Sequence, residues 1–336
     1  MDVGLSIPNR ALLYGGTHVE EVYQLAETAD RDGWHSVWVG DGLVAKPRVE
    51  ALVVLAALAA RTRRARLGVC CLATFPLRHP VLFAAQWASL DVMSAGRTEL
   101  AVCLGIPTGR GGSNFRAELD AMGVAPRDRV PRLEEGIEVV RKLWSSTAGA
   151  PATHAGITTT FADLVLEPRP VQQPCPVWIA SNPDPAKLDA ARFATAVDRV
   201  ARLADGWQTT VIHPAEFGDR WALIRDRAVA HGRAAQDLRS SLHLMVHLAD
   251  DVASARAGGK AFLDRYYGMD TPDEVLDRWG AYGPPELVAE RIAAYVERGL
   301  DLPILRFAAA DQTGQYERAM ADLLPLLGAP AAAIPS

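Results

Sequence analysis

Polar side chains that follow apolar runs mark where this chain could carry chemistry. In the stretch SVWVGDGLVAKP, residues 36–47, Asp41 comes directly after a run that predicts a buried strand. His213 also follows such a run, and His247 lies near the carboxyl end of another. Because the carboxyl ends of parallel strands gather at one edge of a fold, Asp41, His213 and His247 are the candidate catalytic residues. Asp41 also has a structural alternative, in which its carboxylate accepts backbone N–H groups and holds its loop.

The same strand ends are poor in other acids, bases and metal ligands. No H-x-H follows the first predicted strand and no G-x-S-x-G elbow occurs, which disfavours a metal-dependent hydrolase and a serine hydrolase. The four cysteines, Cys70, Cys71, Cys103 and Cys175, form no C-x-x-C pair, so we expect neither a zinc site nor a disulfide framework. A site of this composition suits a cofactor that brings its own reactivity.

Short apolar runs alternate with amphipathic helical segments along the whole chain. The alternation predicts a parallel sheet, and eight repeats predict a single closed (β/α)8 TIM barrel over residues 1–328, followed by a flexible tail at 329–336. An open doubly wound sheet is the alternative, disfavoured by the count and by the absence of G-x-G-x-x-G after the first strand. The predicted strands are residues 2–7, 36–40, 65–72, 97–105, 176–181, 206–212, 241–249 and 302–309. The predicted helices are residues 17–33, 48–62, 79–94, 130–146, 185–204, 214–232, 284–299 and 315–327.

Three segments are longer than the connections of a minimal barrel: residues 106–129, 146–174 and 251–283. We expect them to be long insertions at the C-terminal face of the barrel, where they would line the mouth and act as lids. Alternating threonine and apolar residues within 146–174 also predict a small hairpin or an added strand.

Several blocks, in order along nearly the whole chain, resemble the bacterial luciferase-like superfamily of flavin-dependent monooxygenases and deazaflavin-dependent oxidoreductases. The most specific block is residues 65–105, in which an R-x-P element, a Leu-Asp pair and an S-x-G-R turn occur in order. AETADRDGWHSVWVGD, LEPRPVQQPCPVWIASNPD and YGPPELVAERIAAYVERGLD are similar to other blocks of the family. The fold that the resemblance implies is the (β/α)8 barrel.

The resemblance also implies where a cofactor would bind. A flavin ring would lie across the ends of the third and fourth strands, beside a non-proline cis peptide near Cys70–Cys71. The cofactor's phosphate would lie after the fifth strand, where the SNPD stretch would open a helix and present backbone N–H groups. The candidate cofactor-binding residues are therefore Cys70, Cys71, Leu104, Gly105, Ser181 and Asn182.

The chain departs from the superfamily at several of these positions. Many deazaflavin dehydrogenases have a histidine where this chain has Gly42 and an acid where it has Ile106, so the base and acid of the sugar-oxidising members are missing. Flavin-using members often have arginine at the position of Leu104 and a small hydroxyl residue at the position of Pro183. We expect Gly42, which has no side chain, to leave open space above the cofactor.

Composition limits the partners. The formal net charge is −5, without a block of like charges, which argues against nucleic acid or an anionic membrane surface. The longest apolar run, residues 51–60, is too short to span a membrane, and the first residues do not resemble a signal peptide, so we expect a cytoplasmic protein. The resemblance implies a homodimer.

The expected function is that of a flavin-dependent monooxygenase. Reduced FMN would react with O2 and transfer one oxygen atom to a small organic substrate, and a separate flavin reductase would supply the reduced FMN, because no nicotinamide fingerprint is present. The alternatives are a reductase or dehydrogenase that uses the deazaflavin coenzyme, and a barrel that binds flavin without turnover.

Overall fold

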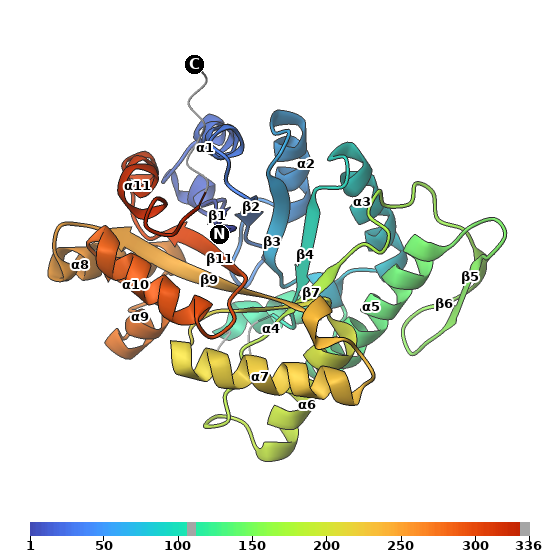
Figure 1. Ribbon diagram of the computed structural model, residues 1–336. Coiled ribbons are helices and arrows are strands. Elements are labelled where there is room, and N and C mark those ends of the chain that lie inside the picture. The colour runs from blue at the N-terminus through green and yellow to red at the C-terminus, as the bar shows by residue number, and fades with distance from the viewer. Residues whose placement is uncertain (106–111, 330–336) are drawn as a thin grey trace.

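The computed structural model describes residues 1–105 and 112–329, and its centre is a closed parallel barrel (Figure 1). Within these residues the strand order β1-β2-β3-β4-β7-β8-β9-β11 closes on itself through the β11–β1 pair, which confirms the predicted eight-stranded barrel. The barrel strands are β1 (Gly4–Ser6), β2 (Ser36–Val39), β3 (Arg66–Leu72), β4 (Thr98–Val102), β7 (Val177–Ala180), β8 (Gly206–Thr209), β9 (Arg239–Leu248) and β11 (Leu302–Phe307).

The helices that surround the barrel follow the predicted segments, and the largest shift of a start is that of α6. They are α1 (Val19–Arg31), α2 (Ala51–Arg61), α3 (Pro80–Met93), α5 (Arg129–Ser145), α6 (Ala190–Leu203), α7 (Pro214–Ala230), α10 (Pro285–Val296) and α11 (Gln312–Arg318), the last followed by a π-helical turn at Ala319–Leu323. Helix α6 begins at Ala190 rather than at residue 185, because the side chain of Asp189 accepts the backbone N–H of Arg192 and caps the helix there.

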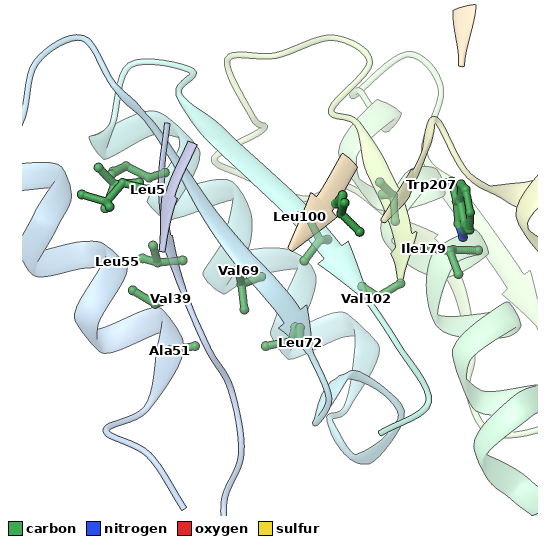
Figure 2. Close-up of a cluster of buried hydrophobic side chains, with 14 of the residues drawn as sticks. Leu5, Val39, Ala51, Leu55, Val69, Leu72, Leu100, Val102, Ile179 and Trp207 are labelled. Carbon is green, nitrogen blue, oxygen red and sulfur yellow. The ribbon is translucent and has the colours of Figure 1, made fainter. Parts of the chain in front are cut away.

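Aliphatic side chains on the outer faces of the strands form the main core between barrel and helices (Figure 2). Leu5, Val39, Val69 and Leu100 are fully buried, as is Leu55 on the facing side of α2. Near-continuous apolar strands are typical of a parallel sheet whose two faces are both covered. Burial of one such side chain contributes roughly 1.5–3 kcal/mol before conformational entropy is counted.

Two indole rings fill the lower half of the barrel interior. Trp38 and Trp178 are 0% and 3% exposed and belong to one cluster with inward-facing residues of β4 and β11. Glycines make room for them: a Cβ on Gly68 would lie 2.2 Å from the Trp38 ring, and one on Gly206 would lie 2.4 Å from the Trp178 ring. The interior is therefore packed at this level, and an open site can exist only above it.

The segment 146–174 contains the predicted hairpin but lies at the other end of the barrel. Strands β5 (Ala152–Ala155) and β6 (Thr160–Leu164) pair antiparallel and project from the right-hand side of Figure 1. Gln172 donates its side-chain N–H to the carbonyl oxygen of Thr98, the first residue of β4, at 3.0 Å. The expectation that this segment lines the mouth is wrong, since a connection from a helix to the next strand runs along the amino-terminal face.

The other two long segments follow strands and lie at the C-terminal face. Residues 251–283 fold as α8 (Val252–Tyr267), α9 (Asp273–Trp279) and β10 (Gly280–Gly283), and β10 pairs in parallel with the end of β9. The other segment contains α4 (Gly112–Ala121) and a 3-10 turn at Pro126–Asp128, while its residues 106–111 lie outside the described residues. The expected tail also lies outside them, apart from its first residue. None of the described helices is long and apolar enough to cross a membrane.

Candidate functional site

The upper layer of the barrel interior forms a polar floor beneath the mouth. The Ser6 hydroxyl lies 3.1 Å from Nε2 of His243 and 3.8 Å from the Cys70 sulfur. Arg306 is 2% exposed and donates from Nη1 to the Ser6 carbonyl oxygen at 3.1 Å. Gln208 faces the same interior, because the residue before it packs outward against aromatic rings of α7. We call Ser6, Cys70, Gln208, His243 and Arg306 the floor.

The titratable groups of the floor are uncharged at neutral pH, apart from the arginine. Burial, aided by Arg306 and Arg48, lowers the pKa of His243 to about 3. Burial raises the pKa of the Cys70 thiol to about 11. Neither group is therefore tuned to exchange a proton near pH 7.

Asp41 is buried beside the floor and holds two loops together. Its Oδ2 accepts the backbone N–H of Thr74 at 2.8 Å, which ties the loop after β2 to the loop after β3. Burial raises the pKa of this carboxyl group, opposed by the Thr74 N–H and by Arg78. These contacts support the structural alternative for Asp41, and its catalytic role stays a prediction.

Gly42 does not open space above the floor, so that expectation is wrong. A Cβ at this position would lie 2.4 Å from the Lys46 carbonyl oxygen and 3.1 Å from Nη1 of Arg48. Arg48 in turn donates to the carbonyl oxygens of Asp41 and Lys46, at 3.1 and 2.9 Å. The glycine is required because the loop turns back on itself here and brings Arg48 over the barrel.

The two histidines predicted to be catalytic lie outside the floor. His213 is the N-cap residue of α7, and its Nδ1 lies 3.1 Å from Nη2 of Arg291 on α10. Nδ1 of His247 lies 2.8 Å from the Ala308 carbonyl oxygen, and its ring packs against α8 at Gly258, where a Cβ would lie 2.4 Å away. His247 therefore anchors α8, and the floor histidine is His243, which the sequence analysis did not select.

The ends of β3 and β4 carry the residues expected beside a flavin ring. The Cys70–Cys71 peptide bond is cis, which confirms that part of the resemblance. Cys71 forms a single disulfide with Cys103, which the expectation of no disulfide framework did not foresee. The bond could not be read from spacing, because the irregular end of β3 brings Cys71 close to a residue 32 positions away in sequence. Beyond β4, Gly105 has a φ of 74°, a conformation that favours glycine.

The disulfide gives a simple test by thiol counting. Cys70 and Cys175 are free, so protein unfolded without reductant is expected to expose two reactive thiols per chain. The same protein treated with reductant should expose four. Titration with a chromogenic disulfide reagent in denaturant measures both values, and four thiols before reduction would contradict the bond.

The two residues expected at a phosphate site, Ser181 and Asn182, differ in whether their polar side-chain atoms already have hydrogen-bond partners. Both amide protons of Asn182 are used, since Nδ2 donates to the carbonyl oxygens of Thr210 and Val211 at 2.6 and 3.0 Å. Its Oδ1 accepts from Arg220 at 2.5 Å. The Ser181 hydroxyl is buried without a partner among the described residues, so it is free to bind a ligand. The helix N-terminus expected here lies further along, at Ala190.

Asn182→Asp is expected to destabilise the loop after β8 by about 1–2 kcal/mol. A carboxylate would face the Thr210 and Val211 carbonyl oxygens in place of an NH2 group, and its attraction to Arg220 would offset only part of that loss. Urea unfolding monitored by tryptophan fluorescence measures the change. Asn114→Asp, at an exposed position on α4, is the control, and equal midpoints for both variants would contradict the assigned contacts.

An aromatic surface on α8, which was not among the candidate site residues, covers the floor. The Tyr266 ring stacks on Phe262 with a centroid separation of 5.2 Å and meets Tyr267 edge-on at 4.9 Å. The guanidinium group of Arg306 lies 4.7 Å from the Tyr266 ring centre, and Nζ of Lys46 lies 4.9 Å from that of Tyr267. The helical spacing of FLDRYY, residues 262–267, is a signal that could have identified this surface.

The residues at the mouth fit a flavin or a deazaflavin. The Gln208 side-chain N–H2 and the Ser181 hydroxyl are buried and unpartnered within the described residues, so they can bind the carbonyl-rich ring and the polar side chain of such a cofactor. Three-residue groups of His, Cys, Asp or Glu that could hold a metal ion do not occur among the described residues.

Comparison with known proteins defines the family. A family model described as luciferase-like monooxygenase matches residues 1–302, so the chain belongs to the luciferase-like monooxygenase family. An F420-dependent glucose-6-phosphate dehydrogenase of Microbacterium testaceum is 31% identical over 91% of this chain and 93% of its own length. The oxygenase component of the flavin-dependent trigonelline monooxygenase of Acinetobacter baylyi is 29% identical over 48% of this chain, and the match spans 43% of that protein.

The solved structures agree on the fold. A monooxygenase from Streptomyces bottropensis superposes with a TM-score of 0.79 at 24% identity, covering 97% of this chain and 99% of that one. The relatives are monooxygenases and F420-dependent dehydrogenases. The chain is therefore an oxidoreductase enzyme of this family.

Proposed function

We propose that this enzyme is a flavin-dependent monooxygenase that uses reduced FMN and O2 to oxygenate a small organic substrate. When bound, reduced FMN supplies two electrons to O2, so that one oxygen atom enters the substrate and the other leaves as water. The observation that carries this proposal is that the floor contains no carboxylate and that burial keeps its imidazole, on His243, and its thiol, on Cys70, neutral, so it offers no tuned proton acceptor. Oxidation of an alcohol by hydride transfer needs such a base, whereas an oxygenase can rely on its cofactor.

In this proposal the chain positions the reactants and excludes water. Cys70, Cys71, Leu104 and Gly105 would border the flavin ring, and Ser181 would bind its phosphate. The aromatic residues of α8 would cover the reacting atoms, which prevents loss of the activated oxygen to water. A separate reductase would supply reduced FMN, as the words "oxygenase component" in the name of the trigonelline relative suggest.

A deazaflavin-dependent dehydrogenase or reductase is the second candidate. It is supported by the F420-dependent glucose-6-phosphate dehydrogenase relative, which matches across 91% of this chain. Against the sugar-oxidising version of that reaction stands Gly42, at a position where the resemblance implies a histidine. A flavin-binding barrel without turnover is the remaining alternative.

Anaerobic titration of the purified protein with reduced FMN and, in parallel, with reduced F420 tests the choice of cofactor. We expect reduced FMN to bind at least about tenfold more tightly, a difference of roughly 1.4 kcal/mol. Rapid mixing with O2 should then show flavin oxidation whose rate or product changes with substrate. Tighter binding of reduced F420 would favour the dehydrogenase, and FMN binding without any oxidation chemistry would favour the non-catalytic barrel.

The proposed assembly is a homodimer formed through the outer helices. Several apolar side chains are exposed on α2 and α3, including Val53 and Met93, which are 64% and 71% exposed. Exposed apolar surface of this kind is typical of a protein interface. Sedimentation velocity measures the mass in solution, and a monomer at micromolar concentration would contradict the proposal.

A further inference from the structure

A group of cations on the β11, β1 and β2 side of the mouth is not used by oxygen transfer. We call Arg10, Lys46, Arg48 and Arg306 the cationic cluster. Arg306 is 2% exposed, yet its Nη2 has no acceptor among the described residues. The same is true of the buried Nε of Arg48 and Nη1 of Arg10. Buried donors without acceptors are costly, so these three atoms indicate a missing acceptor.

Arg48 and Arg306 lie around the same part of the floor. Arg306 is the inward-facing residue near the end of β11. Arg48 lies over Gly40 at the end of β2, where a Cβ would meet Nε of Arg48 at 2.6 Å. Both guanidinium groups act electrostatically on His243 and on Cys70, which places them around the same small volume.

No acidic side chain in the described part of the chain pairs directly with the cationic cluster. Among the described residues, no carboxylate forms a hydrogen bond or an ion pair with any of the four cations. Asp41 is the nearby acid, but its carboxylate binds the Thr74 N–H and faces Arg78 at 3.8 Å. Arg306 is buried and the other three cations are partly buried, and a buried cation without a paired counter-charge is unfavourable unless an anion completes the site.

Aromatic rings border the cluster without supplying that charge. The Arg306 guanidinium lies 4.7 Å from the ring centre of Tyr266 and 5.4 Å from that of Phe262. Cation–π contacts of this kind stabilise a cation and leave its N–H groups free to bind an acceptor. Tyr266 is buried by these contacts, whereas Phe262 and Tyr267 are only partly buried, so their rings can provide an apolar surface for a planar ligand.

We propose that the substrate is a planar aromatic anion, a carboxylate or a phenolate, whose charged group binds Arg48 and Arg306 and whose ring packs against Phe262 and Tyr267. This inference rests on the proposed oxygenase function and names its substrate class. The substrate would occupy the β11–β1–β2 sector, next to the β3–β4 sector expected for the flavin ring. Bidentate binding by a guanidinium group suits a carboxylate, and the neighbouring ring surface excludes water from the pair.

Calorimetric titration of the purified protein with benzoate, 4-hydroxybenzoate and 2-naphthoate tests the substrate class, with the amide of each acid as its neutral isostere. We expect at least one acid to bind about tenfold or more tightly than its amide, as the loss of charge-assisted hydrogen bonds predicts. Arg306→Met should remove this preference, and Arg306→Lys should keep part of it. Arg63→Met, at an exposed position on the amino-terminal face, is the matched control and should behave as wild type.

The cationic cluster could instead bind the phosphate of FMN. Repeating the titrations with reduced FMN distinguishes the substrate from the cofactor phosphate as the bound anion. If the cluster binds the substrate, Arg306→Met lowers affinity for the acid and leaves that for reduced FMN unchanged. Equal binding of acids and amides by the wild type would overturn the inference, as would a loss confined to FMN. Acid binding without FMN binding would keep the anion site and refute the oxygenase. If Arg306→Met does not fold, Arg48→Met takes its place and should likewise reduce the preference for the acid. The ratio of the wild-type affinities for acid and amide needs no variant and tests the inference directly.

Discussion

Gly68→Val is expected to lower the free energy of unfolding by about 3 kcal/mol, the largest loss of stability that we predict for a single substitution. A Cβ at position 68 would lie 2.2 Å from the Trp38 ring, and the ring is fully buried in the barrel interior. The indole cannot move aside, because Trp178, Ala101 and Ile304 belong to the same packed cluster. Close-packed interiors relax only partly when atoms are added, so the remaining clash strains and destabilises the folded state.

Chemical unfolding of Gly68→Val, followed by tryptophan fluorescence and circular dichroism, measures this loss. Gly149→Val is the control, because a Cβ there has no neighbour within 4 Å. Trp38→Leu combined with Gly68→Val should recover part of the stability, since the smaller side chain leaves room for the valine. If the double variant were no more stable than the sum of the single variants predicts, the two residues would not be in steric conflict.

Gly42→His is expected to displace the loop after β2, lowering stability by about 1–3 kcal/mol and catalytic activity at least tenfold. The Cβ would approach the Lys46 carbonyl oxygen to 2.4 Å, and backbone atoms cannot yield as a flexible side chain would. Displacement of this turn also moves Arg48, which is held by the carbonyl oxygens of Asp41 and Lys46. Since Arg48 belongs to the proposed anion site, binding of aromatic acids should weaken with the activity.

Thermal melts and steady-state kinetics on the same preparation distinguish two explanations for Gly42. Gly42→Ala adds only the Cβ, so it should reproduce most of the loss of stability if the close approach to Lys46 is the cause. Gly149→Ala is again the control without contacts. Wild-type stability of Gly42→His combined with low activity would show instead that the glycine leaves space for the substrate.

The sequence by itself determined the barrel, since its signals are local. Apolar runs and helical periodicity depend on neighbours within a few residues, and they located all eight barrel strands and the surrounding helices. The hairpin within 146–174 was also predicted from alternation. The short strand β10 was not predicted. It has four residues and forms because the end of the long strand β9 offers it a free edge for pairing.

Only the tertiary structure decided which polar residues meet. Ser6 and His243 are 237 positions apart, and Ser6 and Arg306 are 300 apart, yet barrel closure makes them neighbours on the floor. The sequence marked His213 by its position after a strand and His247 by its position near the end of one. The contact of His213 with Arg291 and that of His247 with the Ala308 carbonyl oxygen hold both rings outside the floor. The Cys71–Cys103 bond likewise depends on the approach of two neighbouring strands. Local sequence specifies where a strand lies and which of its residues share a face. The residues that a side chain contacts on other strands are set by the curvature and closure of the sheet.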